Sequence, residues 1–270
     1  MKKYLQDKKL FVAVITALIC AVVMVFPALA EEDKPSADLS VAVLSDYIWR
    51  GQELSRDSVV IQPSMTISYM GFSTNIWGNM DTDPYTSSGQ DDPAKWNETD
   101  FTFSYAKDFD LVSVEGGYIY YGLDGADDSQ EFFLSLGMDI FLSPGLTIYK
   151  DCDTYPHWYL LFGISHSLGI TEAVSLELSA SASYLKSEDA DDYPEINDSG
   201  ATTGDKFNGF HDGIISASLP ISVAKYITVT PSLSYIFPLS SDAGDEMKWR
   251  SKKGDDDNFI YGGVTLSMAF

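Results

Sequence analysis

Cysteine, histidine and recognisable catalytic motifs are scarce in this 270-residue sequence, which has two cysteines and three histidines. Cys20 lies in an N-terminal segment that we expect to be cleaved, so Cys152 would be the single thiol left and could form no internal disulfide. A lone thiol also makes no metal cluster. No GxSxG, HExxH or glycine-rich phosphate loop occurs. These absences predict a protein that is not an enzyme and carries no cofactor.

Basic residues are also few, since 17 lysines and arginines stand against 40 aspartates and glutamates and give a net charge of −23. Removal of residues 1–30 takes away four lysines and one aspartate, which makes the net charge −26. A chain without a basic face is not expected to bind nucleic acid. The aromatic content of 13% argues against disorder in spite of the high charge.

Long apolar runs are absent except for one, at residues 10–26. Four lysines precede this run, and an Ala-Leu-Ala cleavage site follows it at residues 28–30. We therefore expect residues 1–30 to be a cleaved secretory signal peptide and residues 31–37 to be a short periplasmic lead-in. A retained membrane anchor is the alternative.

The last ten residues, YGGVTLSMAF, alternate between two kinds of side chain. Val264, Leu266, Met268 and Phe270 fall on one face and small or polar residues on the other, which is the period of a β-strand. Such a strand invites aggregation in water, whereas a closed barrel in lipid supplies both a partner strand and cover for the apolar face. A terminal Phe270 is also typical of the strand that the barrel-assembly machinery reads. The last strand of a soluble sandwich is the alternative.

Segments of this kind recur along the chain, and short connections between them alternate with long ones. The predicted strands are about residues 39–49, 58–69, 72–80, 96–106, 111–121, 130–142, 146–152, 157–168, 173–185, 209–219, 226–237 and 261–270. An even number of strands with alternating turns and loops is typical of bacterial outer-membrane barrels. The sequence therefore predicts an all-β, helix-free protein, a transmembrane antiparallel up-and-down β-barrel of about 12 strands over residues 38–270. Its expected location is the bacterial outer membrane.

Several motifs in the first half of the chain carry a family resemblance. They are SDYIWRG at residues 45–51, QPS at 62–64, GFSTNIWGN at 71–79 and GYIYYG at 117–122. Together they resemble the motifs of the TorF-type porins, a family of proteobacterial outer-membrane proteins, over about residues 40–122. The resemblance implies a barrel of porin type and supplies neither a substrate nor catalytic residues.

The polar face of the strands should line the lumen if the apolar face points to lipid. The candidate pore-lining residues are Asp46, Arg50, Asp100, Glu115, Asp139, Lys150 and Glu177. Acids outnumber bases in this set, which favours cations weakly. The first functional hypothesis is thus a porin-like channel for passive diffusion of small polar solutes or ions, with a weak cation preference. A salt-bridge network that plugs the lumen stays open as an alternative, because twelve strands lie between filled and channel-forming barrels.

Two predicted loops, residues 186–208 and 239–257, are strongly acidic. The candidate metal ligands in them are Asp189, Asp191, Asp192, Asp255, Asp256 and Asp257. Carboxylates at this density could hold Ca²⁺ or bridge through divalent ions to lipopolysaccharide phosphates, although neither loop has EF-hand spacing. A solvated acidic rim is the simpler interpretation. The second hypothesis is therefore a non-conducting structural or adhesion barrel in contact with outer-membrane lipid and lipopolysaccharide.

A lipid-modifying barrel enzyme centred on His166 is the third hypothesis. Ser165 and Ser167 flank this histidine, but neighbours on a strand point to opposite faces and cannot form a dyad with it. A serine on an adjacent strand remains possible as its partner.

Overall fold

The structure, a computed structural model, describes residues 34–55, 58–84, 93–251 and 256–270. The predicted signal peptide lies outside the described residues, as do residues 31–33 of the predicted lead-in. Strand β1 (Ser36–Leu44) begins within the last residues of that lead-in. It belongs to one structural unit that runs from Pro35 to Phe270. In the described parts of the chain, no helix combines the length and the apolar character needed to cross a membrane.

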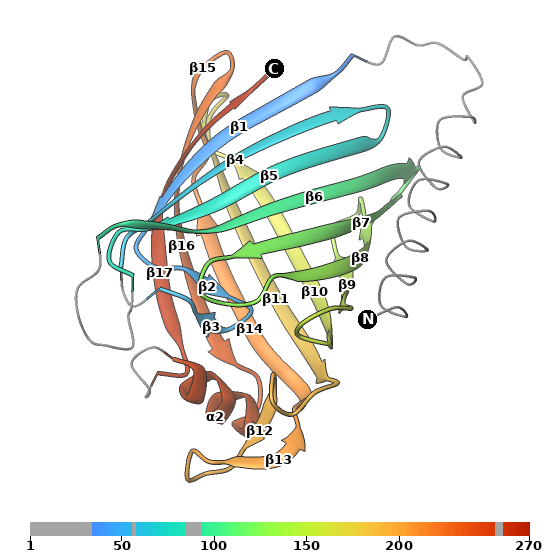
Figure 1. The fold of residues 1–270 in the computed structure, drawn as a ribbon. Coiled ribbons are helices and arrows are strands. Elements are labelled where there is room, and N and C mark those ends of the chain that lie inside the picture. The colour runs from blue at the N-terminus through green and yellow to red at the C-terminus, as the bar shows by residue number, and fades with distance from the viewer. Residues whose placement is uncertain (1–33, 56–57, 85–92, 252–255) are drawn as a thin grey trace, which may run out of the picture. The chain divides into compact units, whose positions relative to one another are not determined.

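Twelve antiparallel strands form a closed barrel (Figure 1). After β1 they are β4 (Val60–Tyr69), β5 (Phe72–Asp81), β6 (Lys95–Phe109), β7 (Val112–Leu123), β8 (Ser129–Met138), β9 (Gly145–Asp151), β10 (His157–Gly169), β11 (Ser175–Ser187), β14 (Asn208–Ser218), β16 (Ile227–Pro238) and β17 (Phe259–Ala269). Each strand pairs with its neighbours in this order, and the pairing of β1 with β17 closes the ring. The predicted fold class and the predicted number of strands are confirmed.

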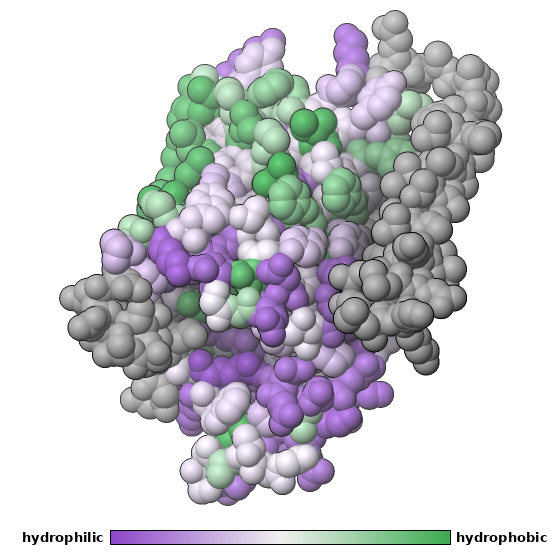
Figure 2. Space-filling view, viewed as in Figure 1, coloured by the Kyte–Doolittle hydropathy of each residue, from purple (hydrophilic) through white to green (hydrophobic). Residues whose placement is uncertain are grey.

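The outer face of the wall is apolar because side chains alternate along each strand. In β17, Val264 and Leu266 are 44% and 52% exposed, and Thr265 between them belongs to the inner face. Figure 2 shows the apolar side chains gathered over the wall strands in the upper part of the view. So many large exposed apolar side chains would be unfavourable in water, whereas lipid is their natural solvent.

The two ends of the barrel differ. At the turn end, tight connections join the strands, as at Met70 and Gly71, whose φ angles of 54° and 83° are those of a type I′ turn. Ala37 and Phe270 exchange backbone hydrogen bonds there, and the short strand β15 (Ile221–Ala224) adds to β16. The opposite loop end carries the hairpin of β12 (Pro194–Ile196) and β13 (Thr202–Lys206) and is mainly hydrophilic in Figure 2.

The second half of the first predicted strand is wrong. β1 ends at Leu44, and the chain then leaves the wall and forms β2 (Ile48–Trp49) and β3 (Gln52–Glu53), which pair only with each other. Tyr47 and Trp49 keep the period of two because the arm of a hairpin is extended as well. Periodicity alone therefore cannot separate a wall strand from an inward hairpin.

The expectation of a helix-free chain is also wrong. Helix α2 (Ser241–Arg250) lies within the predicted loop at residues 239–257. It begins after Ser240, whose Oγ accepts a hydrogen bond from the Ala243 N–H at 3.1 Å. An acidic first turn and a basic last turn complement the helix dipole. These end signals are readable in the sequence, but the high charge of the segment conceals them.

Buried apolar side chains gather inside the barrel at the loop end. One cluster consists of Tyr159, Leu185, Tyr193, Phe207 and Ala243, and a second of Ile48, Ile236, Met247 and Phe259. Both clusters join wall strands to elements of the loops. The core of this protein therefore holds loop segments against the inner wall.

Candidate functional site

The hairpin of β2 and β3 lies inside the barrel. Its central residues, Arg50 and Gly51, have φ angles of 50° and 77°, which define a type I′ turn. A Cβ on Gly51 would lie 3.2 Å from Asp212 Cβ of β14, so the tip of the hairpin touches the wall. At its base, Tyr47 packs on Trp77 of β5 with ring centroids 5.6 Å apart. The hairpin thus crosses the lumen between these two contacts.

Arg50 binds two residues of the opposite wall. Its Nη1 and Nη2 donate to Glu131 Oε1 and Oε2 of β8 at 2.7 and 2.8 Å. Nη1 also lies 2.9 Å from His157 Nε2 of β10. The Arg50 side chain is 7% exposed and the Glu131 side chain is fully buried. A buried ion pair with this bidentate geometry fixes the hairpin in one position.

Aromatic rings surround the same guanidinium group. The Arg50 Cζ lies 4.5 Å from the ring centroid of Tyr149 and 4.4 Å from those of Tyr159 and Trp49. Such distances are those of cation–π contacts, which strengthen when water is excluded.

A second polar network holds α2 to β14. His211 lies between two carboxylates, with Nδ1 2.9 Å from Asp212 Oδ1 and Nε2 3.1 Å from Glu246 Oε2. Arg250 also donates to Glu246. Neighbouring residues His211 and Asp212 are both buried because the β11–β14 register shifts around Ser183. Burial opposes the charge of Glu246, but its bonds to His211 and Arg250 outweigh that effect and hold the pKa of this carboxyl below its usual value.

Tyr159 links the two networks. Its ring stacks on Arg50, and its hydroxyl donates to both oxygens of Asp212 at 3.0 and 3.1 Å. Ser183 Oγ donates to the same carboxylate at 2.7 Å. The hairpin (residues 46–55) and α2 are therefore parts of one connected network, which we call the plug. It lies in the loop-end half of the lumen.

The turn-end half of the lumen is lined by small hydroxyl groups instead. A cavity of about 270 Å³ lies against β9, β10 and β11, and its inward polar lining includes Thr147, Ser165, Ser179 and Ser181. We call this cavity the vestibule. Gly163 belongs to the same lining, and its missing side chain widens the space.

The predicted pore-lining residues occupy several kinds of position. Asp46 and Arg50 belong to the plug, and Asp46 accepts a hydrogen bond from the Tyr47 N–H at 2.8 Å. Asp100, Glu115 and Glu177 alternate with outward side chains and face the lumen. Buried Asp100 Oδ1 has no hydrogen-bond partner among the described residues.

Two other predicted pore residues lie away from the lumen. Asp139 follows the end of β8 at Met138 and is exposed in a turn, because the predicted sixth strand was four residues too long. Lys150 lies in register with the outward Phe132 and Trp158. Its Nζ sits 5.3 Å from the Trp158 ring centroid and pairs with Glu188 at 2.6 Å, so this lysine faces outward.

The predicted metal ligands of the acidic loops make contacts with other residues of the loop end. The N–H of Asp191 donates to Asp189 Oδ1 at 2.9 Å, and the carbonyl of Asp192 accepts from Arg250. Asp257 pairs with Lys248 at 3.1 Å. Asp256 lies next to it, and Asp255 lies outside the described residues.

The structure brings a different set of ligand atoms together. Glu131, Asp151 and His157 each offer an atom within 4.8 Å of the others, and all three are buried. This set and the rings around it were not predicted from the sequence. The available signal was the position of each residue at the loop end of a predicted strand, directly beside a long or polar connection.

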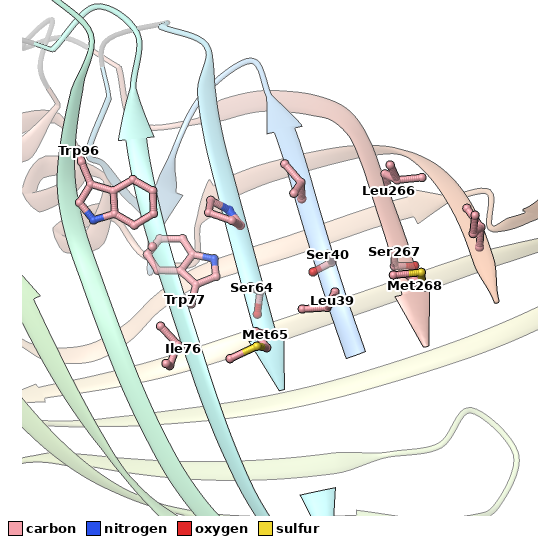
Figure 3. Close-up of a pocket in the computed structure, with 14 residues that line it drawn as sticks. Leu39, Ser40, Ser64, Met65, Ile76, Trp77, Trp96, Leu266, Ser267 and Met268 are labelled. Atoms are coloured by element: carbon pink, nitrogen blue, oxygen red, sulfur yellow. The ribbon is translucent and has the colours of Figure 1, made fainter. Parts of the chain in front are cut away.

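A larger cavity, of about 560 Å³, lies elsewhere. Figure 3 shows it across β17, β1, β4, β5 and β6. Most of its lining comes from outward apolar side chains such as Met65, Ile76 and Leu266. It therefore belongs to the lipid boundary and not to the lumen.

His166 lies on the outward face as well. Its partner in register on β11 is Leu178, and its ring contacts Phe141 with centroids 5.4 Å apart. This position, close to the turn end, is that of a polar residue at the membrane interface.

The closed ring of antiparallel strands, the apolar outer face and the polar interior define a transmembrane β-barrel of the bacterial outer membrane. Among solved structures, the chain is similar to the porin NanC, with 12% identity and a TM-score of 0.53 over 87% of this chain and 98% of that one. It also aligns with a bacterial polysaccharide outer-membrane secretin, with 9% identity and a TM-score of 0.42 over 89% of this chain and 100% of that one. An anion-selective porin from Comamonas acidovorans aligns with 8% identity and a TM-score of 0.36, over 88% and 99% of the two chains.

The likeness to NanC supports the barrel fold, and the other two structures are too distant to add to it. No protein-family model and no curated protein matches the chain. The resemblance to the TorF-type porins therefore stays a prediction.

Proposed function

We propose that this protein is a porin-like channel for small polar solutes, with a plug that restricts its loop end. One observation carries the proposal. Inward side chains in the turn-end half, such as Ser165, Glu177 and Ser179, are exposed to solvent although they point into the barrel. A barrel with a purely structural role would gain stability by filling this space with large side chains.

The charge of the lumen supports a weak preference for cations. Glu115 and Glu177 face the water-accessible interior, whereas the basic Arg50 is neutralised by Glu131 and Lys150 faces outward. An excess of fixed negative charge raises the local concentration of cations and lowers that of anions.

The plug favours one second candidate, a barrel that does not conduct. Its outer loops would then act through divalent ions on lipopolysaccharide, and the acidic residues of the β11–β14 connection are the candidates for that contact. The exposed Phe270, beside β17, supports recognition of this strand by the barrel-assembly machinery. The register partner of His166 on β11 is Leu178 and not a serine, so this position gives a barrel enzyme no support.

Single-channel recording of the refolded protein in planar bilayers separates the two candidates. A channel should give discrete open steps, and a salt gradient should give a reversal potential of the sign expected for cations. A protein that shifts on gels with heating, as folded barrels do, but stays electrically silent would favour the non-conducting candidate.

A further inference from the structure

The tip of the inward hairpin holds an arginine where glycine or asparagine is usual. Type I′ turns require a positive φ at both central residues, and this conformation is strained for a residue with a Cβ. Arg50 adopts it with a φ of 50°. Contacts of the Arg50 side chain with the wall must offset the strain, so the residue is explained by what it binds and not by the turn.

The wall offers a carboxylate that matches a guanidinium group. Both oxygens of Glu131 accept, one from Nη1 and one from Nη2, at 2.7 and 2.8 Å. Two parallel hydrogen bonds of this kind need a planar donor fork, which a guanidinium group has and an ammonium group lacks.

Other wall residues orient the acceptors without help from the hairpin. Tyr121 OH donates to Glu131 Oε2 at 2.8 Å. His157 Nδ1 donates to the carbonyl of Tyr155 at 2.6 Å, which leaves Nε2 to accept from Arg50 Nη1 at 2.9 Å. The receptor is therefore built by the wall and does not depend on the residue that fills it.

Two rings of the wall provide flat faces for the bound group. Tyr149 of β9 and Tyr159 of β10 have ring centroids 4.5 and 4.4 Å from the Arg50 Cζ. The remaining ring, that of Trp49, belongs to the hairpin itself. A carboxylate fork between aromatic faces selects a planar cation over a spherical one.

We propose that Glu131, His157, Tyr149 and Tyr159 form a binding site for the guanidinium group of a small solute, and that Arg50 is the tethered group that fills it when the hairpin is docked. A solute with a guanidinium head then competes with Arg50 and releases the hairpin. The gating half of this inference rests on the proposed channel function, and the binding half does not.

A divalent metal ion is the competing ligand for the same place, since Glu131, Asp151 and His157 could supply its ligands. Arg50 Nη1 lies between Glu131 Oε1 and His157 Nε2, which are 3.6 Å apart. Asp151 is already held by Ser129 Oγ at 2.6 Å. The aromatic faces have no role in holding a metal ion, so the whole set of contacts favours guanidinium.

Binding is tested first in the purified R50A protein, where the tethered competitor is absent. Calorimetric titration with methylguanidinium should give saturable binding, and methylammonium should bind at least about tenfold more weakly. The variant R50A/E131Q should lose the binding, whereas the matched control R50A/E188Q, which alters an exposed carboxylate, should keep it. Equal binding of the two cations, binding that survives E131Q, or binding of Zn²⁺ without methylguanidinium would overturn the proposal.

Folding of each variant is verified by its heat-dependent shift on gels. If R50A does not fold, R50K serves in the same titration, because lysine keeps the charge but cannot form the donor fork. Methylguanidinium should then bind R50K, and failure to bind it would again reject the site.

Gating is tested separately on the wild-type protein in bilayers. Methylguanidinium should raise the fraction of time spent open, and methylammonium at equal ionic strength should not. A positive titration with a silent bilayer would keep the binding site and reject the channel. A conducting bilayer with no binding to R50A would keep the channel and reject the site.

Discussion

The inward face of β10 passes through two different environments. In its loop-end half, His157 and Tyr159 are 1% and 2% exposed, whereas Ser165, on the same face in the turn-end half, is exposed to solvent. Strand β11 repeats the contrast with Ser183, which is buried, and Ser179, which is exposed. The wall is continuous through both halves, so the difference comes from what occupies the lumen.

The chemistry of each half follows from its occupant. Buried charges such as Glu131 and Asp212 require partners at defined positions, because an unpaired buried charge is very costly. The buried groups of the loop-end half must therefore keep one arrangement, or the plug undocks from the wall. Hydroxyl groups facing water have no such requirement, and the vestibule can stay open without any fixed contact.

Removal of the inward hairpin should change the loop-end half of the lumen, and with it the conductance, more than any other variant. Replacing residues 46–54 with a short glycine–serine linker should raise single-channel conductance severalfold, because the narrowest part of the lumen is widened. Shortening the exposed turn at residues 197–201, between β12 and β13, is the matched control and should leave conductance unchanged. Equal conductance of the wild type and the hairpin deletion would show that the plug does not limit flow.

The substitution E131Q should undock the hairpin without deleting it. It leaves the Arg50 charge buried without its carboxylate, which should weaken docking of the hairpin by about 3–5 kcal/mol. The docking equilibrium should then shift by roughly a hundredfold to several thousandfold. The readout is the rate at which a water-soluble thiol reagent labels Cys introduced as Q52C in a C152S background, since Gln52 is buried in the docked hairpin.

The control for this labelling is E188Q, which removes an exposed carboxylate that pairs with Lys150. Its labelling rate should match that of the parent because exposed ion pairs contribute little. Labelling of E131Q at the parental rate would mean that the Arg50–Glu131 pair does not hold the hairpin.

A large side chain in the vestibule should lower the conductance, which is the opposite of the effect of removing the hairpin. G163W places an indole in the hydroxyl-lined cavity, where a Cβ has its nearest neighbour, the Ala180 carbonyl oxygen, at 3.8 Å. Conductance should fall by a large fraction. The adjacent F162W changes the outward face of the same strand and should leave conductance as it is, and a similar fall in both variants would point to damage of the wall.

The sequence predicted the wall better than its contents. All twelve strands were found because one alternation, such as that of Val264, Leu266 and Met268, repeats in each of them. In the two segments that enter the lumen, the side-chain pattern does not predict the position in the barrel. The hairpin keeps the period of a strand, and α2 is a short, charged helix whose buried Glu246 contacts His211, which is 35 positions away in the sequence.

The positions of charged residues were likewise predicted better in the wall than in the plug. Glu115, Glu177 and Lys150 were all predicted to line the lumen. Lys150 faces outward instead, because its position relative to the apolar face was misjudged in β9, the most polar of the predicted strands. The pairing of Arg50 with Glu131 joins residues 81 positions apart. No local pattern indicates such a contact, which follows only from the closure of the ring.

Acidification should loosen the α2 side of the plug by a moderate amount. The pKa of Glu246 lies below its usual value, which is about 4.3, so its ionised form stabilises docking of α2 against His211 at neutral pH. This contribution is present above the ordinary pKa and is lost as the pH falls through the lower, folded value. Conductance should therefore rise only once the pH falls below the usual pKa of a glutamate. The variant E246Q should already be open at neutral pH and change less, and an equal pH response in both would place the effect elsewhere, for example on Asp212.

The smallest effect is expected for ion selectivity. The double variant E115Q/E177Q removes two inward carboxylates without touching the plug, so conductance should change little while the reversal potential in a salt gradient moves toward zero. K150Q is the control, since it removes one charge from the outer face. If K150Q shifts the reversal potential as much as the double variant does, selectivity depends on the total charge of the protein near the pore mouth and not on the lumen. A shift confined to E115Q/E177Q would locate the selective charge in the turn-end half of the lumen. The plug would then control access, and the inward carboxylates of the turn-end half would discriminate between ions.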